Sequence, residues 1–252
     1  RTDHAAAVYD GRIWVLGGRD GAYYQAKEHN DVWNSSDGRH WTSATLSAPW
    51  VPRYGHSAFS FAGKLWMHGG VSKFDWVGGT WGTTDGTSWT LNWAGFGYNA
   101  AAVHKGKVFV VGKTSDYIGW DLHEFGFVMA FNGTDWFEIN TDPPWIAREG
   151  HALVSARGRL WLIGGAGHSF SGEGFALRDV WSSPDGRDWQ LESGPAPFPA
   201  RWAHTAVATH DRIVVMGGAQ VVYGDSPWYP LNDVWYTELY PRAAARNWEL
   251  YP

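Results

Sequence analysis

A block that begins with His and ends with Gly-Gly recurs along the chain, and this repeat constrains the fold more than any other feature. Its five copies start at His4, His56, Asn99, His151 and His204. The third copy is the weakest, because Asn99 stands in the His place and Lys113 stands where the second Gly would be. The starts follow one another at a period of about 50 residues, which indicates a repeat architecture rather than independent domains.

Local chemistry predicts four short strands in each copy. Short apolar runs rich in β-branched and aromatic residues favour buried second strands, and these runs are Ile13–Leu16, Leu65–His68, Val108–Val111, Leu160–Ile163 and Ile213–Met216. The preceding strand is rich in small residues, as at Ala5 to Ala7, so we expect it to be innermost. Two-residue connections such as Asp10-Gly11 predict tight hairpins between the first two strands, and we expect Asp37-Gly38 to do the same between the last two.

A four-stranded meander of this kind cannot bury both of its faces alone, but five arranged radially can. We therefore predict an all-β fold, a β-propeller of five four-stranded antiparallel blades in a single domain over residues 1–252. The expected blades cover approximately residues 1–49, 50–94, 95–143, 144–197 and 198–252.

The diglycine after an apolar strand, the later Trp and the Asp-Gly…Trp pattern resemble the kelch repeat. In the first copy these residues are Gly17-Gly18, Asp31-Val32-Trp33, Asp37-Gly38 and Trp41. Kelch propellers more often have six or seven blades. Five copies leave two alternatives, a five-bladed ring, which we favour, or part of a larger propeller.

Composition excludes several classes of site and partner. Twenty Lys and Arg against 25 Asp and Glu give a net charge of −5, so nothing favours a nucleic-acid or anionic-membrane partner. The absence of Cys excludes disulfides and thiolate metal sites. No apolar run approaches the roughly 18 to 20 residues of a spanning helix, and no signal peptide precedes Arg1. We expect a soluble protein without membrane insertion, and the compartment stays open, secreted and periplasmic ones included.

An arginine stands three residues before the repeated His in four copies, as Arg1, Arg53, Arg148 and Arg201. The kelch resemblance implies that these guanidinium groups surround the mouth of a central channel. Like charges gathered there would favour a carboxylate, sulfate, phosphate or acidic peptide. The alternative is that each Arg pairs with a backbone carbonyl or a nearby acid, such as Asp3 or Glu149, and holds neighbouring blades together.

Aromatic residues gather on the long connections, all of which we expect on one face of the propeller. Flat apolar rings beside Asp, Asn and Gly suit sugar faces or a protein partner, although the same rings could cap the blade edges. The predicted ligand-binding residues are Arg1, Arg53, Arg148, Arg201, Tyr54, Tyr98, Glu149, Trp202, Trp76, Trp120 and Trp228.

The repeated His residues could in principle converge on a metal. A residue present once per blade is better explained by a repeated structural bond to the adjacent blade's backbone, so we expect no metal and no cofactor. We interpret His68, His104, His123 and His168 as surface or loop residues. Asp3 and Glu149 could act as acid and base, but other loop acids, Glu124 among them, are equally eligible, and the catalytic residues stay unknown.

Fold alone does not decide function. Our leading hypothesis is a binding module that engages a carbohydrate or an acidic peptide through its Arg and aromatic residues on the long-loop face. The alternative is an enzyme acting on a sugar or uronic acid, similar to kelch epimerases and lyases, with its site in the central funnel.

Overall fold

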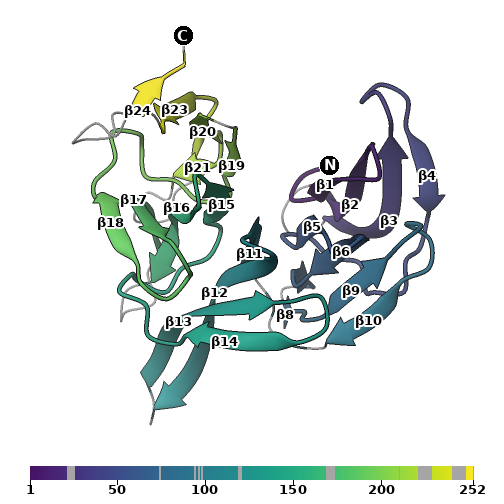
Figure 1. Cartoon of the computed structure of the whole chain (residues 1–252), viewed down its shortest axis with the longest axis horizontal. Helices are drawn as coiled ribbons and strands as arrows, with labels where there is room; N and C mark the ends of the chain where they lie inside the picture. Colours follow the sequence, from purple (N-terminus) through teal and green to yellow (C-terminus); the bar gives the residue numbers. More distant parts are fainter. Residues whose placement is uncertain are drawn as a thin grey trace. The chain divides into compact units, whose positions relative to one another are not determined.

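The computed structural model describes the chain except for residues 22–25, 74, 94, 96, 98, 119–120, 169–173, 210, 221–228, 240–247 and 252. Every regular element in the described part is a β-strand (Figure 1). Across these described ranges there is no helix of the length and apolar character needed to cross a membrane.

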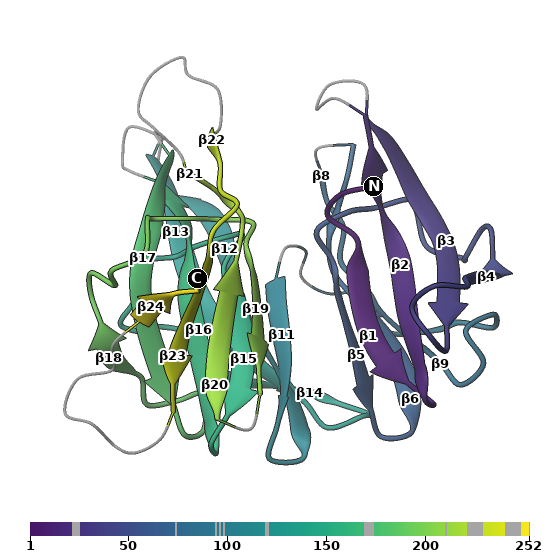
Figure 2. The same cartoon turned by 90° about the horizontal axis from the view of Figure 1, so that it is seen from above.

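The strands form five four-stranded antiparallel sheets, as predicted, and we call these sheets blades 1 to 5. Blade 1 contains β1 (Ala5–Tyr9), β2 (Arg12–Asp20), β3 (Lys27–Ser35) and β4 (Thr42–Thr45), and blade 2 contains β5 (Ser57–Phe61), β6 (Lys64–His68), β9 (Thr80–Thr83) and β10 (Thr90–Trp93). Blade 3 contains β11 (Asn99–His104), β12 (Lys107–Ile118), β13 (Asp121–Phe131) and β14 (Trp136–Asn140). Figure 2 shows the first three strands of blade 1 running side by side.

Blades 4 and 5 repeat this order. Blade 4 contains β15 (Ala152–Ala156), β16 (Arg159–His168), β17 (Gly174–Ser183) and β18 (Gln190–Ser193), and blade 5 contains β19 (Thr205–Ala208), β20 (Arg212–Met216), β23 (Val234–Glu238) and β24 (Trp248–Leu250). Two short pairs lie outside the blades, namely β7 (Val71–Ser72) with β8 (Asp75–Trp76), and β21 (Ala219–Gln220) with β22 (Tyr229–Pro230). Each predicted second strand is present.

The two kinds of hairpin differ from each other. Between β1 and β2, Asp10 and Gly11 both have positive φ, 47° and 67°, as the predicted tight turn requires. The prediction of an equally tight turn at Asp37-Gly38 is wrong, because only Gly38 has positive φ and the connection runs from Ser35 to Thr42. Asp37 instead accepts the backbone N–H groups of Arg39 and His40, both at 2.8 Å. A side chain that satisfies the backbone in this way replaces the ladder hydrogen bonds of a shorter turn.

The chain divides into two compact units, residues 1–103 with 132–135 and residues 104–131 with 136–252, and each is described by itself. In unit 1 the first strands β1 and β5 are neighbours. A core that includes Trp14, Leu16, Leu65 and Met67 lies between their blades. In unit 2, β15 and β19 are neighbours in the same way. These pairs agree with the predicted inner position of the small-residue strands.

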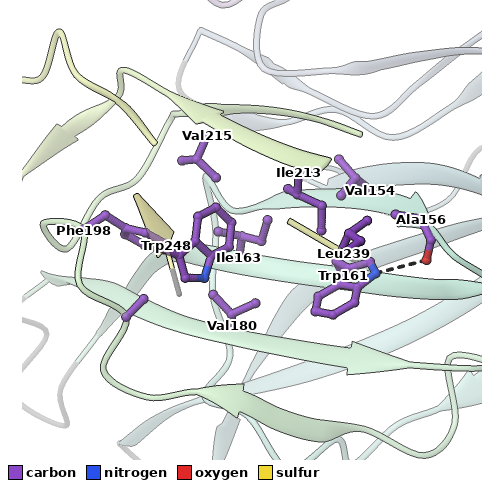
Figure 3. Close-up of a cluster of buried hydrophobic side chains, with 11 residues drawn as sticks. Val154, Ala156, Trp161, Ile163, Val180, Phe198, Ile213, Val215, Leu239 and Trp248 are labelled. Atoms are coloured by element: carbon purple, nitrogen blue, oxygen red, sulfur yellow. Dashed lines mark hydrogen bonds between the residues drawn. The ribbon is translucent and has the colours of Figure 1, made fainter. Parts of the chain in front are cut away.

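The core of unit 2 shows what the apolar runs contribute (Figure 3). Trp161, Ile163, Phe198 and Ile213 lie in one cluster drawn from blades 4 and 5, and each is at most 1% exposed. The indole of Trp161 donates to the carbonyl of Ala156 at 3.2 Å, so its one polar group is satisfied within the blade. Burial between neighbouring sheets therefore explains the apolar runs on the second strands.

Close packing explains the diglycine of blade 4. An added Cβ on Gly165, at φ 107°, would lie 2.9 Å from the Cβ of His151 and from the carbonyl oxygen of Glu149. On Gly164 it would lie 3.0 Å from the carbonyl oxygen of Arg201, which belongs to the segment leading into blade 5. The strand bulges here, since its pairing register shifts between Ile163 and Gly165. Glycine thus allows each second strand to pass between two closely packed neighbours.

Blade 3 lacks this bulge. Lys113 replaces the second Gly, and β12 pairs with β13 without a register shift from Val108 opposite Phe131 to Ile118 opposite Asp121. The hairpin is therefore a regular extension of the blade. A side chain is present at the position where the other blades need none, and this difference creates the site described next.

Candidate functional site

Three of the four repeated arginines are bound by a carboxylate of their own blade. Arg148, with 0% of its side chain exposed, donates to both oxygens of Asp179 at 2.6 and 2.8 Å, and Arg201 donates to both oxygens of Asp233 at 2.9 and 2.8 Å. Arg1 makes the same pair with Asp31, at 2.8 Å for each bond. In all three, Nη1 also donates to the carbonyl of the first Gly of the diglycine, at 2.9 to 3.2 Å.

These contacts favour the structural alternative for Arg1, Arg148 and Arg201. The partners expected from the sequence, Asp3 and Glu149, are not the ones used, because each Arg reaches an Asp about 30 residues further along its own blade. Bidentate pairs of this kind are geometrically specific. Ligand binding by these three residues stays a prediction, and our proposals do not rest on it.

Arg53 differs from the other three. It is 3% exposed and donates to the carbonyls of Val51 at 3.2 Å, Gly69 at 2.8 Å and Gly78 at 3.1 Å, and its Nη1 also lies 3.9 Å from Met67 Sδ. Burial lowers the pKa of Arg53 to about 10. Arg53 is thus a buried cation without a carboxylate partner among the described residues.

Three of the four repeated His residues, His56, His151 and His204, are buried, whereas His4 is exposed. Burial, assisted by the adjacent arginine, lowers the pKa of His56, His151 and His204 to about 3. His151 hydrogen-bonds the carbonyl of Val111 in β12 at 3.2 Å, which is the predicted structural bond to the adjacent blade. In the part of the chain that the structure describes, no three His, Cys, Asp or Glu side chains are grouped so as to hold a metal.

The interpretation of His68 and His104 as surface or loop residues is wrong. His68 is 1% exposed, hydrogen-bonds the Thr80 hydroxyl at 2.8 Å and lies parallel to the ring of Trp93. His104 is 3% exposed and hydrogen-bonds the Ser155 hydroxyl at 2.9 Å. Both residues fall on strands, where the surrounding sheets cover them.

Lys113 is the centre of a polar cluster in unit 2, which we call the lysine cluster (Lys113, Glu124, Glu149 and His168). The Lys113 ammonium lies 2.5 Å from Glu124 Oε1, 3.3 Å from Glu149 Oε2 and 3.1 Å from His168 Nδ1. His168 Nδ1 also lies 3.3 Å from Glu124 Oε2. Only 2% of the Lys113 side chain is exposed, whereas the other three expose 18 to 33%. The cluster therefore has a buried cation and three groups that solvent reaches.

The charges within the cluster set the state of Glu124. Burial alone would raise the pKa of Glu124, but hydrogen bonds from His168 and Lys113 and the Lys113 charge outweigh it, so the pKa is lowered. Glu124 is thus a carboxylate at neutral pH. The N–H groups of the Lys113 ammonium face two carboxylates and an imidazole. The groups of the cluster that solvent reaches are therefore mainly hydrogen-bond acceptors.

Four separate segments bring the cluster together. Lys113 lies in β12 and Glu124 in β13, where Ser115 is opposite Glu124. Glu149 lies in the segment leading into blade 4 and forms an isolated antiparallel bridge with Ala166, and His168 ends β16. The position after each repeated Arg forms the same bridge in blades 1, 2 and 5. The cluster is therefore built on regular strand pairing rather than on long loops.

The other predicted site residues have varied surroundings. Trp202 lies against Gly150, the residue after Glu149, with ring atom Cε3 3.0 Å from where an added Cβ would lie. Tyr54 lies in unit 1 beneath the guanidinium of Arg19, 4.1 Å from the ring centre, and Arg19 is paired with Asp3 at 2.7 Å. Trp76 in β8 is 42% exposed. Tyr98, Trp120 and Trp228 lie outside the described residues.

Sequence reasoning included Glu149 but missed Lys113 and His168, and it did not single out Glu124 from the other loop acids. The available signal was the break in the repeat, because Lys113 is the only residue to replace a Gly of the diglycine. A long cationic side chain at a position that is otherwise glycine implies that other side chains of the protein pair with its charge. The partners lie 11 to 55 residues away, at distances that no spacing rule in the sequence supplies.

Comparison with known proteins supports the fold and the repeat. The kelch motif model matches residues 1–34. Among solved structures, the one described as "Structure of YjhT" superposes with a TM-score of 0.75 at 15% identity, covering 100% of this chain and 84% of that one. A search of curated proteins finds no match by sequence. With five four-stranded antiparallel blades, the chain is a β-propeller whose first blade matches the kelch motif.

Proposed function

We propose that the chain is a binding module that engages a carbohydrate at the lysine cluster of unit 2. One observation carries this proposal: a buried ammonium holds two carboxylates and an imidazole together, and all three of these keep 18 to 33% of their side chains exposed. Such a group is fixed in place before a ligand arrives, so binding does not have to order it.

The charge balance favours a carbohydrate over an acidic peptide. The cluster contains one lysine and two glutamates, so an acidic segment would meet an excess of like charge. A sugar hydroxyl both donates and accepts, and it matches carboxylate acceptors beside an imidazole. We propose that the partly buried ring of Trp202, which lies against Gly150 directly after Glu149, supplies the apolar surface of the site.

An enzyme acting on a sugar remains the second candidate, because Glu124 and His168 lie within hydrogen-bonding distance of each other. The lowered pKa of Glu124 makes it a poor proton donor at neutral pH, which favours binding over acid catalysis. Incubating any bound glycan with the protein and following its NMR spectrum separates the two. An unchanged spectrum supports binding, and new resonances that require His168 support an enzyme.

A glycan array followed by titration of each hit tests the proposal. We expect Glu149→Gln and His168→Gln each to weaken binding roughly tenfold or more, since each removes a hydrogen bond at a charged group. Both side chains are partly exposed, so these variants should fold. Glu192→Gln is the matched control, because Glu192 is a partly buried carboxylate of blade 4 that accepts from Ser182 on the outer strands. An array without hits, or hits that neither cluster variant weakens, would overturn the proposal.

A further inference from the structure

Blades 1, 4 and 5 share a three-residue arrangement that uses one carboxylate oxygen twice. In blade 4, Asp179 Oδ2 accepts from Arg148 Nη2 at 2.8 Å and from Trp181 Nε1 at 2.7 Å. In blade 5, Asp233 Oδ2 accepts from Arg201 Nη2 and Trp235 Nε1 at 2.8 and 2.7 Å. Blade 1 has the same pair of bonds to Asp31 Oδ2, both at 2.8 Å, from Arg1 and Trp33. One oxygen therefore satisfies an arginine and an indole in each blade.

Blade 2 keeps the arginine and the indole but has no carboxylate there. Gly79 stands two residues before Trp81, as the Asp stands two residues before Trp in the other three blades. The strand pairing is equivalent, because Trp81 is opposite Met67 just as Trp235 is opposite Val215. Gly69 N–H donates to the Gly79 carbonyl at 3.0 Å, and Gly217 N–H donates to the Asp233 carbonyl at 3.1 Å. Blade 2 differs in lacking the carboxylate side chain and in the backbone at Gly79, whose φ is 110°.

Two donors in blade 2 are left without the shared oxygen. Arg53 Nη1 donates to Gly69 and Gly78, so the Gly78 carbonyl replaces the first carboxylate oxygen. Over the described residues, no acceptor lies within hydrogen-bonding distance of Arg53 Nη2 or of Trp81 Nε1. Arg53 is 97% buried, and a buried cation of this kind costs free energy unless an anion is beside it.

The space in front of Gly79 is bordered by side chains and not by backbone. An added Cβ would lie 3.0 Å from Trp81 Nε1 and 3.6 Å from Leu91 Cδ1, and no backbone atom is among its nearest three neighbours. These side chains can adjust by small rotations. The indole nitrogen of Trp81 is the nearest atom to this space.

We propose that blade 2 binds a carboxylate group from solution, with one of its oxygens accepting from both Arg53 Nη2 and Trp81 Nε1. The ligand takes the place of the Asp carboxylate that the other three blades carry, and it is either a free small carboxylate or the carboxylate of a larger molecule. The site lies wholly in unit 1 and does not rest on the carbohydrate site proposed for unit 2.

Titration with sodium formate and sodium acetate tests the proposal, with calorimetry and the unfolding midpoint as readouts. Sodium chloride at the same ionic strength controls for screening, and acetamide, the neutral analogue of acetate, controls for shape. We expect saturable binding of formate or acetate, a midpoint that rises with occupancy, and no response to acetamide. Benzoate distinguishes the sources, since binding of this larger acid requires an open site. Formate or acetate binding without benzoate binding assigns the site to small free carboxylates.

Variants locate the binding at blade 2. Trp81→Phe keeps the ring and removes the Nε1 donor, and we expect it to weaken formate binding roughly tenfold or more. Trp33→Phe is the matched control, because it removes the same donor in blade 1, where Asp31 already supplies the oxygen. Arg53→Gln should abolish formate binding. Absence of saturable binding to the wild-type chain, an equal response to acetamide, or equal affinity in Trp81→Phe and Trp33→Phe would overturn the proposal.

Discussion

Blade 4 keeps every residue of the repeat, whereas blade 3 has lost three of them in the part up to the diglycine. Where blade 4 has Arg148, His151 and Gly165, the sequence of blade 3 has Phe96, Asn99 and Lys113. The second Gly and the His are linked by packing, because in blade 4 an added Cβ on Gly165 would lie too close to the Cβ of His151. The absence of this His in blade 3 is therefore consistent with a side chain at the Gly position. Without that contact, β12 runs on as a regular strand and carries Lys113.

This comparison indicates that the repeated residues form the structural framework of the blades. The candidate binding groups lie where a blade departs from the repeat. In blade 4 the Arg has its Asp, the His is neutral and the Gly is enclosed. The lysine cluster arises where blade 3 departs from that pattern, and the incomplete site at Arg53 arises where blade 2 does.

The largest expected effect comes from Asp179→Ala. This change leaves Arg148, with 0% of its side chain exposed, as an unpaired buried cation. Breaking a buried pair in this way costs about 3 to 5 kcal/mol of unfolding free energy. Urea denaturation of unit 2 measures it.

Formate sharpens the comparison with blade 2. If an absent carboxylate makes a site, formate should restore part of the stability of Asp179→Ala, whereas chloride at equal ionic strength should not. Asp188→Ala is the control, since Asp188 is an exposed residue of the loop between β17 and β18. A loss below 1 kcal/mol in Asp179→Ala would show that the pair contributes little to the framework.

A smaller loss is expected from Gly165→Ala. At φ 107° a residue with a Cβ is strained, and the Cβ would lie 2.9 Å from the carbonyl oxygen of Glu149. Strain of this kind costs about 1 to 3 kcal/mol. The equivalent change in blade 3, Lys113→Ala, adds no backbone strain because β12 is regular there. Denaturation midpoints of the two variants check this, and a Gly165→Ala protein as stable as the wild type would contradict it.

Much of the framework could be predicted from the sequence, because it depends on local periodicity. The apolar second strands, the Asp10-Gly11 type of turn and the period of about 50 residues all act over short separations. The partner of Arg148 could not be predicted in this way. Glu149 is its neighbour in sequence, but the carboxylate that binds it is Asp179, which strand pairing brings from 31 residues away.

The candidate sites were harder to predict for a similar reason. The sequence marked Lys113 as a departure from the repeat, but a departure does not show which residues surround it. The bond from Lys113 to Glu149 joins the hairpin of blade 3 to the segment leading into blade 4. The burial of His68 and His104 likewise comes from how neighbouring sheets cover them, which the spacing of His residues does not reveal.

The smallest effect is expected from His151→Asn, which gives blade 4 the residue that blade 3 has at Asn99. Burial lowers the pKa of His151 from 6.5 to about 3 in the folded state. Above pH 6.5 neither state binds a proton, but below it the unfolded state does and the folded state does not. The unfolding free energy therefore falls as the pH drops from about 6.5 to 3, by about 1.4 kcal/mol per pH unit for one such His.

Urea denaturation at several pH values between 6 and 4 measures this slope, and His151→Asn should make it shallower by about that amount. The slope separates titration from packing, since the loss of the contacts of His151 lowers stability equally at every pH. Ile163→Val is the matched control, because it removes one methylene from the same fully buried region and changes no titrating group. If the slope were the same in His151→Asn and in the wild type, the imidazole of His151 would take up a proton in the folded protein. The repeated His would then have to be regarded as a titratable group that could take part in binding or catalysis.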